Sequence, residues 1–399
     1  MNSKATQTVL VLGDQRQALA VIRSLARIGY RVIFATSLKH SNVAKSRFIA
    51  ETWHLNSAGV EKLRMELLER MAGRPDISLV FPIAEVDMQC LRQRDVPKPI
   101  RVISASEESA ALCRDKTKLL AMAHERGVPV ARWVKVRDSA ALLDAVADIG
   151  FPLVLKPDVN AETDLGFKAL ILKSPAEALP EIKRFPQEGL IVQRHAEGFR
   201  HNVYFVAREG RLLGLGESRI LRTDRLDGTG LAVEGITVSP SVALSRYTEQ
   251  LVQAISYTGV GCAQFLLDER TGEVCFLEIN PRLGANSNII CRAGMDLPRA
   301  FVDVVCGRDP SVGKWDIGRR YAWLSGDLNG FLDERSKMNL AAAFLWLGRL
   351  LRAQVRADDH VTWDWADPRP TLSMLRDRLA RILRSPFRRS TVSLDKERS

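Results

Sequence analysis

The sequence predicts two architectures in succession, a small doubly wound α/β domain followed by a larger α+β unit. Over residues 1–112, short apolar runs alternate with amphipathic helical stretches, which is typical of a parallel sheet covered by helices. From residue 113 strands and helices mix without strict alternation, which indicates an α+β arrangement. The chain has 399 residues, 46% hydrophobic and 26% charged side chains, and is long enough for two or three packed units.

The first domain opens with a buried strand, TVLVLG, an amphipathic helix, QALAVIRSLARIG, and a second strand, YRVIFATS. Two further apolar runs, ISLVFPIAE and IRVISAS, continue the alternation. The first turn reads GDQRQA, and it lacks the second and third glycines that the pyrophosphate of a dinucleotide requires. We therefore do not expect a Rossmann cofactor in this domain.

Two acids, Glu85 and Asp87 in FPIAEVD, follow a strand end of the first domain. Open α/β sheets gather their ligands at such strand ends. Acids at the start of a helix are equally expected, because they complement the positive end of the helix dipole. The sequence leaves both interpretations open.

The second unit begins with a polar entry and a helix, CRDKTKLLAMAHERG, and continues through GVPVARW to the helix LLDAVADIG. The strand FPLVLKP, the polar loop DVNAETDLGFK, the strand ALILKS and the helix AEALPEIKRF follow. Strands are then expected in GLIVQRHAEG, HNVYFVAREGRLLGLGE and the hairpin VGCAQFLLDERTGEVCFLEIN. From about residue 310 we expect a strand in KWDIGRRYAWLSGD and helices in LAAAFLWLGRLLRAQV and MLRDRLARILR.

The last strand of the hairpin is interrupted by polar side chains in FLEINPR. Successive strand residues face opposite ways, so Phe276, Glu278 and Asn280 are expected on one face. Leu277 and Ile279 are then expected on the other face, which belongs to a core.

A register centred on the turn of the hairpin places Gln264 directly opposite Glu278. One carboxylate and two amide oxygens, from Gln264, Glu278 and Asn280, suit Mg²⁺, which completes its shell with water and phosphate oxygens. Arg282, just beyond, can meet a phosphate or a carboxylate with two hydrogen bonds. The alternative is a solvated sheet face that ends at Pro281.

Lys156 ends the otherwise apolar strand FPLVLKP. It is a second candidate contact for an anion. Lysines at strand ends are also common as solvated edge residues, so Lys156 alone decides nothing.

Five motifs follow one another along the chain: DK before a helix, GVPV, FPLVLKP, IVQRHAEG and the hairpin ending in LEINPR. In this order they resemble the ATP-grasp superfamily over roughly residues 1–310. The stretches GITVSPSV, GVGCAQFLLD and GEVCFLEINPRLGANS look most like the carbamoyl-phosphate synthase large-chain and carboxylate–amine ligase branches. LEINPR is the most specific of these motifs.

The resemblance implies a pre-ATP-grasp domain at residues 1–112 and a two-lobed ATP-grasp fold at 113–310, with ATP held between the lobes. The lid lobe would span about residues 131–197. Residues 311–399 would form a C-terminal extension that contains a basic amphipathic helix.

The resemblance also implies roles for single residues. Lys116 and Lys156 would contact the phosphates of ATP, and Arg282 would steady the transferred phosphoryl group or the acyl phosphate. The residues beside the adenine would be Gln193, Arg194, His195 and Ala196, with His201 near the ribose or phosphates. The ligands of Mg²⁺, with Mn²⁺ as the alternative ion, would be Gln264, Glu278 and Asn280.

Three departures from the family pattern concern the nucleotide site. Most relatives carry a glutamate where Gln264 stands, which puts the metal affinity in doubt. The lid loop DVNAETDLGFK has only Gly166, so Lys168 would supply charge in place of glycine backbone N–H groups. Gln193 stands where a glutamate is common, which weakens the expected adenine contact.

The function that the resemblance implies is an ADP-forming ligase, which activates a carboxylate as an acyl phosphate and joins it to an amine. At the level of the family, one partner would be an amino acid or a small metabolite. The acceptor would be contacted by Glu85, Asn286, Ser287 and Asn288. The alternative is a nucleotide-binding sensor or scaffold without turnover, which the departures at Gln264 and in the lid loop support.

Charge and cysteine usage bear on location and partners. The net charge is +11, of which residues 372–399 contribute +5, and no aromatic-rich basic patch predicts nucleic-acid binding. Six scattered cysteines without a CxxC pair, and an N-terminus without a secretory signal, favour a cytoplasmic protein with reduced thiols. A homodimer is left open.

The C-terminal segment predicts a basic amphipathic helix. Its apolar positions are Leu375, Leu379, Ile382 and Leu383, with Arg376, Arg378, Arg381 and Arg384 between them. Docking on the protein's own body is the favoured interpretation, and contact with an anionic membrane is the alternative.

Overall fold

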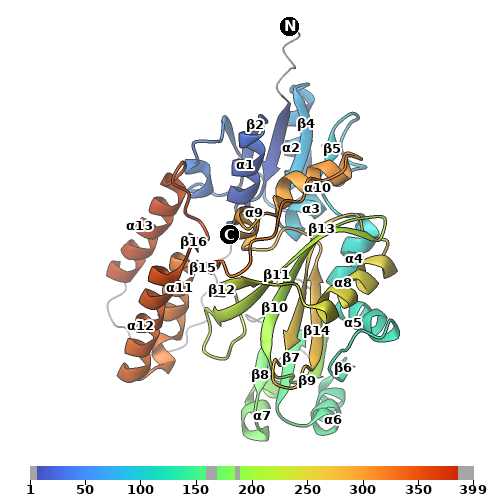
Figure 1. Ribbon diagram of the computed structural model, residues 1–399, viewed down its shortest axis with the longest axis vertical. Coiled ribbons are helices and arrows are strands. Elements are labelled where there is room, and N and C mark those ends of the chain that lie inside the picture. Colours follow the sequence, from blue (N-terminus) through green and yellow to red (C-terminus); the bar gives the residue numbers. More distant parts are fainter. Residues whose placement is uncertain (1–6, 159–168, 185–188, 385–399) are drawn as a thin grey trace.

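The computed structural model describes residues 7–158, 169–184 and 189–384 of the chain. Figure 1 shows an N-terminal α/β domain at one end, two antiparallel sheets in the centre and below, and the C-terminal helices along one edge. The predicted fold class is confirmed, because a parallel sheet is followed by an α+β part.

The N-terminal domain contains a parallel five-stranded sheet in the order β3-β2-β1-β4-β5. Its strands are β1 (Thr8–Leu12), β2 (Arg31–Thr36), β3 (Glu51–His54), β4 (Ile77–Pro82) and β5 (Arg101–Val102). Its helices are α1 (Ala18–Arg27), the 3₁₀ turn η1 (Val43–Lys45), α2 (Val60–Ala72) and α3 (Glu85–Cys90). The strand order reverses between β1 and β4, where open α/β sheets bind ligands.

Gly13 directly follows β1, where the strand order reverses. Its φ is +112°, and a Cβ there would lie 2.0 Å from Oδ2 of Asp87. Only glycine allows both the backbone conformation and the close approach of α3. Asp87 accepts a hydrogen bond from the Ala84 N–H, so it caps the helix, and burial raises its pKa to about 7.

Two helices, α4 (Glu107–Arg114) and α5 (Lys116–Glu125), lead to a four-stranded antiparallel sheet in the order β6-β9-β7-β8. Its strands are β6 (Trp133–Val136), β7 (Leu153–Pro157), β8 (Leu170–Leu172) and β9 (Leu190–Arg194). Two helices accompany it, α6 (Ser139–Ile149) and α7 (Pro175–Arg184). This sheet falls within the range expected for a lid lobe.

The central sheet has seven strands in the order β14-β13-β10-β11-β12-β15-β16. They are β10 (Phe199–Arg208), β11 (Arg211–Thr223), β12 (Ala232–Val238), β13 (Gly259–Leu267), β14 (Val274–Asn280), β15 (Arg320–Ala322) and β16 (Asp359–His360). The accompanying helices are α8 (Val242–Ala254), α9 (Ser287–Arg292) and α10 (Leu297–Val305).

The central sheet is covered on both faces. On one face, Val203 and Phe205 of β10 pack with Leu251 of α8 in one core cluster. On the other, Tyr204 and Val206 pack in a second cluster that also contains residues of α1 and α10. Alternate residues of β10 therefore enter different cores, and the face of Tyr204 is turned toward the N-terminal domain.

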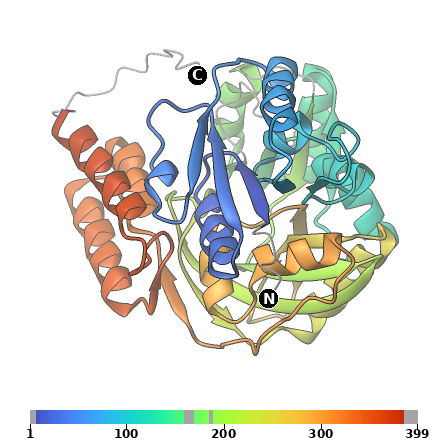
Figure 2. The ribbon, with the colours of Figure 1, turned by 90° about the horizontal axis from the view of Figure 1, so that it is seen from above.

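The C-terminal part contributes α11 (Leu324–Glu334), the 3₁₀ turn η2 (Arg335–Lys337), α12 (Leu340–Arg356) and α13 (Arg369–Arg384). Its strands belong to the central sheet, since β15 pairs with β12 and β16 pairs with β15. Strand pairing thus crosses residue 310. Helices α11, α12 and α13 gather at one edge of the molecule in both ribbon views (Figures 1 and 2).

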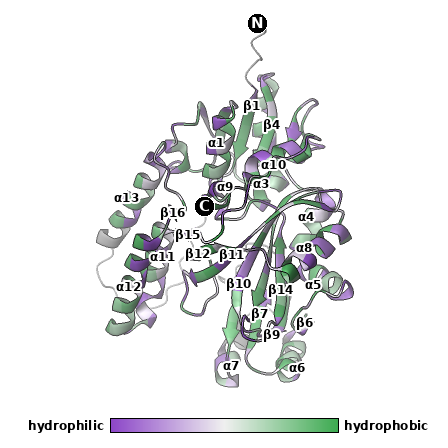
Figure 3. Cartoon of the chain, in the orientation of Figure 1, coloured by the Kyte–Doolittle hydropathy of each residue, from purple (hydrophilic) through white to green (hydrophobic). Residues whose placement is uncertain are grey.

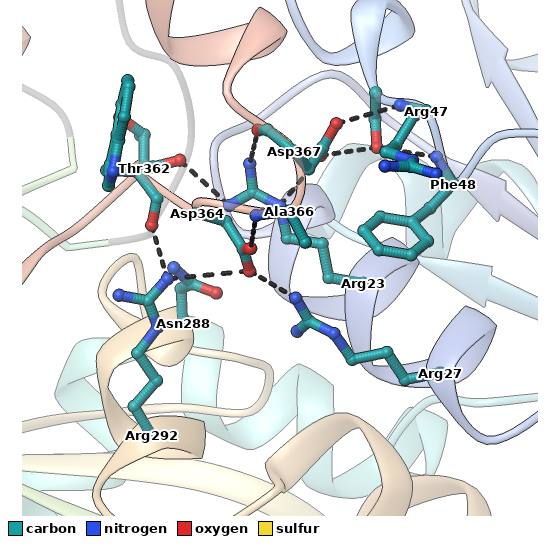
Figure 4. A network of polar contacts seen from close by, with 12 residues as sticks. Arg23, Arg27, Arg47, Phe48, Asn288, Arg292, Thr362, Asp364, Ala366 and Asp367 are labelled. Carbon is teal, nitrogen blue, oxygen red and sulfur yellow. Dashed lines mark hydrogen bonds and ion pairs between the residues drawn. The ribbon is translucent and has the colours of Figure 1, made fainter.

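A buried ion pair joins this C-terminal part to the N-terminal domain (Figure 4). Arg23 of α1 donates to Oδ2 of Asp367 at 3.0 Å and to the Thr362 carbonyl at 2.9 Å. The same Asp367 accepts from the Ser46 hydroxyl and the Arg47 N–H. Both charges are almost fully buried, so each depends on the other for compensation.

Candidate nucleotide and substrate site

The predicted register of the hairpin is confirmed, because Gln264 of β13 lies directly opposite Glu278 of β14. The prediction for the other residues of FLEINPR is wrong in part. A β-bulge follows, and Phe265 pairs with Phe276, so that Leu277 is an extra residue on β14. Phe276 and Ile279 are consequently both in the core, and Leu277 is only half-buried.

The bulge leaves the polar side chains together on the sheet face turned toward the N-terminal domain. Asn280 donates from Nδ2 to Oε1 of Glu278 at 2.9 Å. Across the sheet, Gln264 lies opposite Asn202 of β10, which lies opposite Ser218 of β11. Directly opposed residues share a face, so these five side chains form one polar row.

This donor set fits a hard cation such as Mg²⁺. It offers one carboxylate and amide oxygens, and the Asn202 Oδ1 is buried without a hydrogen-bond partner among the described residues. Within the same described ranges, no group of three or more His, Cys, Asp or Glu side chains could hold a metal. A metal here would therefore depend on Glu278 and on amide oxygens such as those of Gln264 and Asn280.

Two buried lysines approach this row, Lys156 from β7 of the four-stranded sheet and Lys116 from the start of α5. Lys156 of β7 donates to Oε1 of Gln193 at 2.7 Å, and Lys116 donates to the Pro157 carbonyl at 3.0 Å. Burial, and next the charge of Lys116, lower the pKa of Lys156 to about 8, while the charge of Glu278 opposes the shift. Two dehydrated cations beside one carboxylate form an environment that favours a bound anion.

The segment between β9 and β10 carries the chain from the four-stranded sheet to the central sheet. Gln193 is buried and donates from Nε2 to the Ala131 carbonyl at 3.2 Å, while Arg194 donates to the Ile149 carbonyl. His195 is half-buried, and its Nδ1 lies 3.6 Å from Oε1 of Glu197. Ala196 follows it in the chain. The predicted hinge thus lies at the junction of the two sheets, and its contact with adenine stays a prediction.

His201, predicted to lie near the ribose or phosphates, lies on the face of β10 opposite to that of Gln264. Its cross-strand neighbours are Arg219 and Phe265, and its Nδ1 lies 2.6 Å from Oε1 of the buried Glu217. Strand alternation places Asn202, not His201, on the face of Gln264. The contact of His201 with ribose or phosphates stays a prediction, and we propose Asn202 as a further candidate because it shares the face of Gln264.

Three arginines gather beyond the polar row, and two of them were not predicted. Arg16, after β1, donates to the Ala285 carbonyl at 2.9 Å and to Oδ1 of Asn286 at 3.1 Å. Its guanidinium lies 3.4 Å from the ring centroid of Trp323, and burial lowers its pKa to about 10. Arg200 of β10 keeps a buried Nε without a hydrogen-bond partner among the described residues.

Arg282 links this arginine group to the N-terminal domain. Its Nε lies 3.8 Å from Oε1 of Glu85, which stands at the start of α3. Tyr321 lies within electrostatic reach of Arg16 and Arg200, and burial still raises the pKa of its hydroxyl. The arginines, Glu85 and Tyr321 therefore converge at the crevice between β1 and β4.

The remaining predicted substrate residues do not all lie at one site. Asn286 belongs to the arginine group through Arg16, and Ser287 donates to the Gly284 carbonyl. Asn288 donates to the Val361 carbonyl at 3.0 Å and thus faces the C-terminal segment (Figure 4). Lys168 and Gly166 lie outside the described residues.

Comparisons with known proteins agree with this arrangement. The family model "Carbamoyl-phosphate synthase L chain, ATP binding domain" matches residues 232–309, which include Gln264, Glu278, Asn280 and Arg282. A solved ADP complex of N5-carboxyaminoimidazole ribonucleotide synthetase superposes with a TM-score of 0.64 at 13% identity, covering 88% of this chain and 98% of that one. The chain therefore has the ATP-grasp fold, and it is similar to carbamoyl-phosphate synthase large chains in the matched region. Its ATP-grasp fold therefore contains both the lysine pair and the polar row.

The curated relatives that this chain resembles are distant. The arginine-specific carbamoyl phosphate synthase large chain of Bacillus subtilis (strain 168) is 24% identical over 291 residues, which cover 68% of this chain and 27% of that protein. An N-terminal section of the large chain from Methanopyrus kandleri is 25% identical over 259 residues, 60% and 43% respectively. The chain thus spans about a quarter to under half of the length of these relatives.

Two further solved structures share the ATP-grasp fold. The biotin carboxylase domain dimer of the Hydrogenobacter thermophilus 2-oxoglutarate carboxylase, in complex with MgADP, superposes with a TM-score of 0.64 at 15% identity (79% of this chain, 74% of that one). An L-amino acid ligase from Bacillus licheniformis superposes with a TM-score of 0.58 at 13% identity (76% and 75%). At these identities the likeness establishes the fold alone.

Proposed function

We propose that the chain is an ADP-forming ligase that activates a small-molecule carboxylate as an acyl phosphate and joins it to an amine. The observation that carries the proposal is the sequence of charges along one sheet face. Lys156, with Lys116 close to it, lies within electrostatic reach of Glu278 at one end, and Arg282, Arg200 and Arg16 follow toward the N-terminal domain. One end suits a triphosphate, and the other suits a second, anionic substrate.

The chemistry assigns each group a task. Lys116 and Lys156 would hold the phosphates of ATP, while Arg282 would orient the carboxylate toward the γ-phosphorus. The carboxylate oxygen forms a bond to that phosphorus as the bond to the β–γ bridging oxygen breaks, and ADP leaves. The amine then attacks the acyl carbon, phosphate leaves with its electron pair, and the nitrogen loses a proton.

Mg²⁺, held by Glu278 with amide oxygens of Gln264 and Asn280, would neutralise charge on the transferring phosphoryl group. Glu85 would fix the guanidinium of Arg282 by their ion pair, and Trp323 would fix that of Arg16 by stacking. These contacts hold both arginines in place before the substrate arrives.

An ADP-release screen tests the proposal. The full-length chain is given Mg·ATP with carboxylates, bicarbonate included, each with and without a set of amines. The proposal expects ADP release that needs a carboxylate, and a product whose mass equals both substrates minus water. Release of ADP at the same rate without any carboxylate would contradict the proposal.

One observation favours a second candidate, a nucleotide-binding sensor or scaffold. The polar row holds a single carboxylate, Glu278, because Gln264 occupies the position opposite it. Titration calorimetry with Mg·ATP separates the two functions. ATP binding without turnover on every pair would favour the scaffold.

A further inference from the structure

Helix α12 (Leu340–Arg356) is apolar on two opposite sides. Its inner side packs through Trp346, Leu350 and Ala353, which are buried, and the Trp346 indole donates to Oδ1 of Asp327 at 2.8 Å. Its outer side carries Leu340, Phe344, Leu351 and Val355, which are 63% to 84% exposed. A continuous line of exposed apolar side chains marks an interaction site, so the outer side calls for a partner.

The outer residues form one continuous line on α12. They are spaced by four, seven and four positions, which keeps them on a single helical face. We call these four residues, Leu340, Phe344, Leu351 and Val355, the apolar stripe. Figure 3 shows apolar segments of α12 at the outer edge of the molecule.

A row of arginines flanks the apolar stripe. Arg349, Arg352 and Arg356 are exposed, follow one another at helical spacing, and form no ion pair within the described part of the chain. Helix α12 contains no acidic residue at all. An apolar line beside free arginines is typical of a helix that lies in the interface of a lipid bilayer.

The neighbouring helix α13 adds to this edge. It packs on the body through Met374, which contacts a core cluster, so the favoured prediction that this helix docks on the body agrees with the structure. Leu372 and Leu379 nevertheless remain exposed, as does Trp365 in the loop before the helix. Tryptophan at such a border is typical of membrane interfaces.

We propose that α12, with the outward residues of α13, is a docking surface for an anionic lipid membrane. No helix within the described ranges is long and apolar enough to cross a bilayer, so the contact would be peripheral. The positive charge of the exposed arginines favours an anionic membrane as the partner of this surface. The arginine row would meet anionic headgroups while the apolar stripe enters the boundary of the acyl chains, and the site face stays turned toward the N-terminal domain.

Vesicle sedimentation of the full-length chain, without nucleotide, tests the proposal. Vesicles of phosphatidylcholine alone are compared with vesicles that also contain phosphatidylglycerol, at low salt and at about 1 M salt, where the Debye length is roughly 3 Å. We expect binding to the anionic vesicles at low salt and a strong loss at high salt. Absence of binding to the anionic vesicles, or equal binding to neutral ones, would overturn the proposal.

Matched variants localise the contact. The double variant Phe344→Glu, Leu351→Glu is expected to lower the partition coefficient by roughly tenfold or more, because two exposed apolar anchors become anionic. Met65→Glu on α2 is the control, since Met65 is 70% exposed but lies far along the chain from α12. Both substitutions are at exposed positions, so circular dichroism should show unchanged folding.

Two further outcomes would assign the surface to another occupant. If Arg388→Gln with Arg389→Gln removes vesicle binding and the α12 variant does not, the tail binds the membrane and the proposal for α12 fails. If sedimentation velocity shows a dimer that the α12 variant dissociates, and the wild-type chain does not bind vesicles, the apolar stripe is an interface between two copies.

Discussion

We propose Lys156 as a contact for the phosphates of ATP, so its lowered pKa should make ATP binding pH-dependent. In the free protein, burial and the charge of Lys116 bring this pKa to about 8. A bound triphosphate favours the protonated lysine, so binding takes up a proton wherever the free lysine is neutral. At about pH 9, only about one molecule in ten has Lys156 protonated, and the affinity for ATP should be about tenfold weaker than at about pH 7.

Titration calorimetry in two buffers of different ionisation enthalpy measures both quantities. We expect close to one proton taken up per nucleotide at about pH 9 and far less at about pH 7. Lys156→Arg is the comparison, since arginine stays protonated at both values and should abolish the proton uptake. Equal affinity and no uptake at both pH values in the wild-type chain would refute the account of Lys156.

The lowered pKa of Lys156 also affects how the free energy of unfolding depends on pH. Because the folded-state pKa of Lys156 lies below its ordinary value of 10.5, the unfolded chain binds more protons between about pH 8 and 10.5. The free energy of unfolding should therefore rise with pH across that window, by on the order of 3 kcal/mol from this residue. Urea unfolding of the wild-type chain against Lys156→Met isolates this contribution, and an identical pH slope in both would contradict it.

Three further predictions follow from named contacts. Glu278→Ala should lower the rate of ADP release by about 10³-fold or more, because the only carboxylate of the polar row is lost; a normal rate would remove Glu278 from the metal site. His201→Ala should leave the Kd for ATP unchanged in calorimetry, whereas Asn202→Ala should raise it, and the reverse pattern would favour the predicted contact of His201 instead. Asp367→Ala should lower the free energy of unfolding in urea by roughly 3–5 kcal/mol, since Arg23 would be buried unpaired; the exposed Asp377→Ala is the control and should change it by less than about 1 kcal/mol.

Local rules predicted the parts of the site that lie within one hairpin. Turn position and strand alternation are enough to bring Gln264 opposite Glu278. The bulge at Leu277 could not be predicted in this way, because the apolar pattern of one strand does not show which of its residues lacks a partner on the neighbouring strand. The face of the central sheet on which His201 lies could not be predicted for a related reason. It depends on which face of that sheet α8 covers.

The arginine group required tertiary structure. Arg16 stands in the turn GDQRQA, which contains no local motif for an anion site. Its partners Asn286 and Trp323 lie about three hundred residues away in sequence, so the local sequence around Arg16 does not predict them. The strand expected in KWDIGRRYAWLSGD is present as the three residues of β15, whereas β16, with two residues, was not predicted, and neither was the pairing of both strands with the central sheet.

The proposed reaction is tested most directly by following one oxygen atom. If a carboxylate attacks the γ-phosphorus of ATP and an amine later displaces phosphate, one carboxylate oxygen must leave with that phosphate. The full-length chain is therefore given a carboxylate labelled with ¹⁸O, an amine and Mg·ATP, using a pair found active in the ADP-release screen. The account predicts one ¹⁸O atom in the inorganic phosphate, measured by mass spectrometry, and phosphate without label would contradict it.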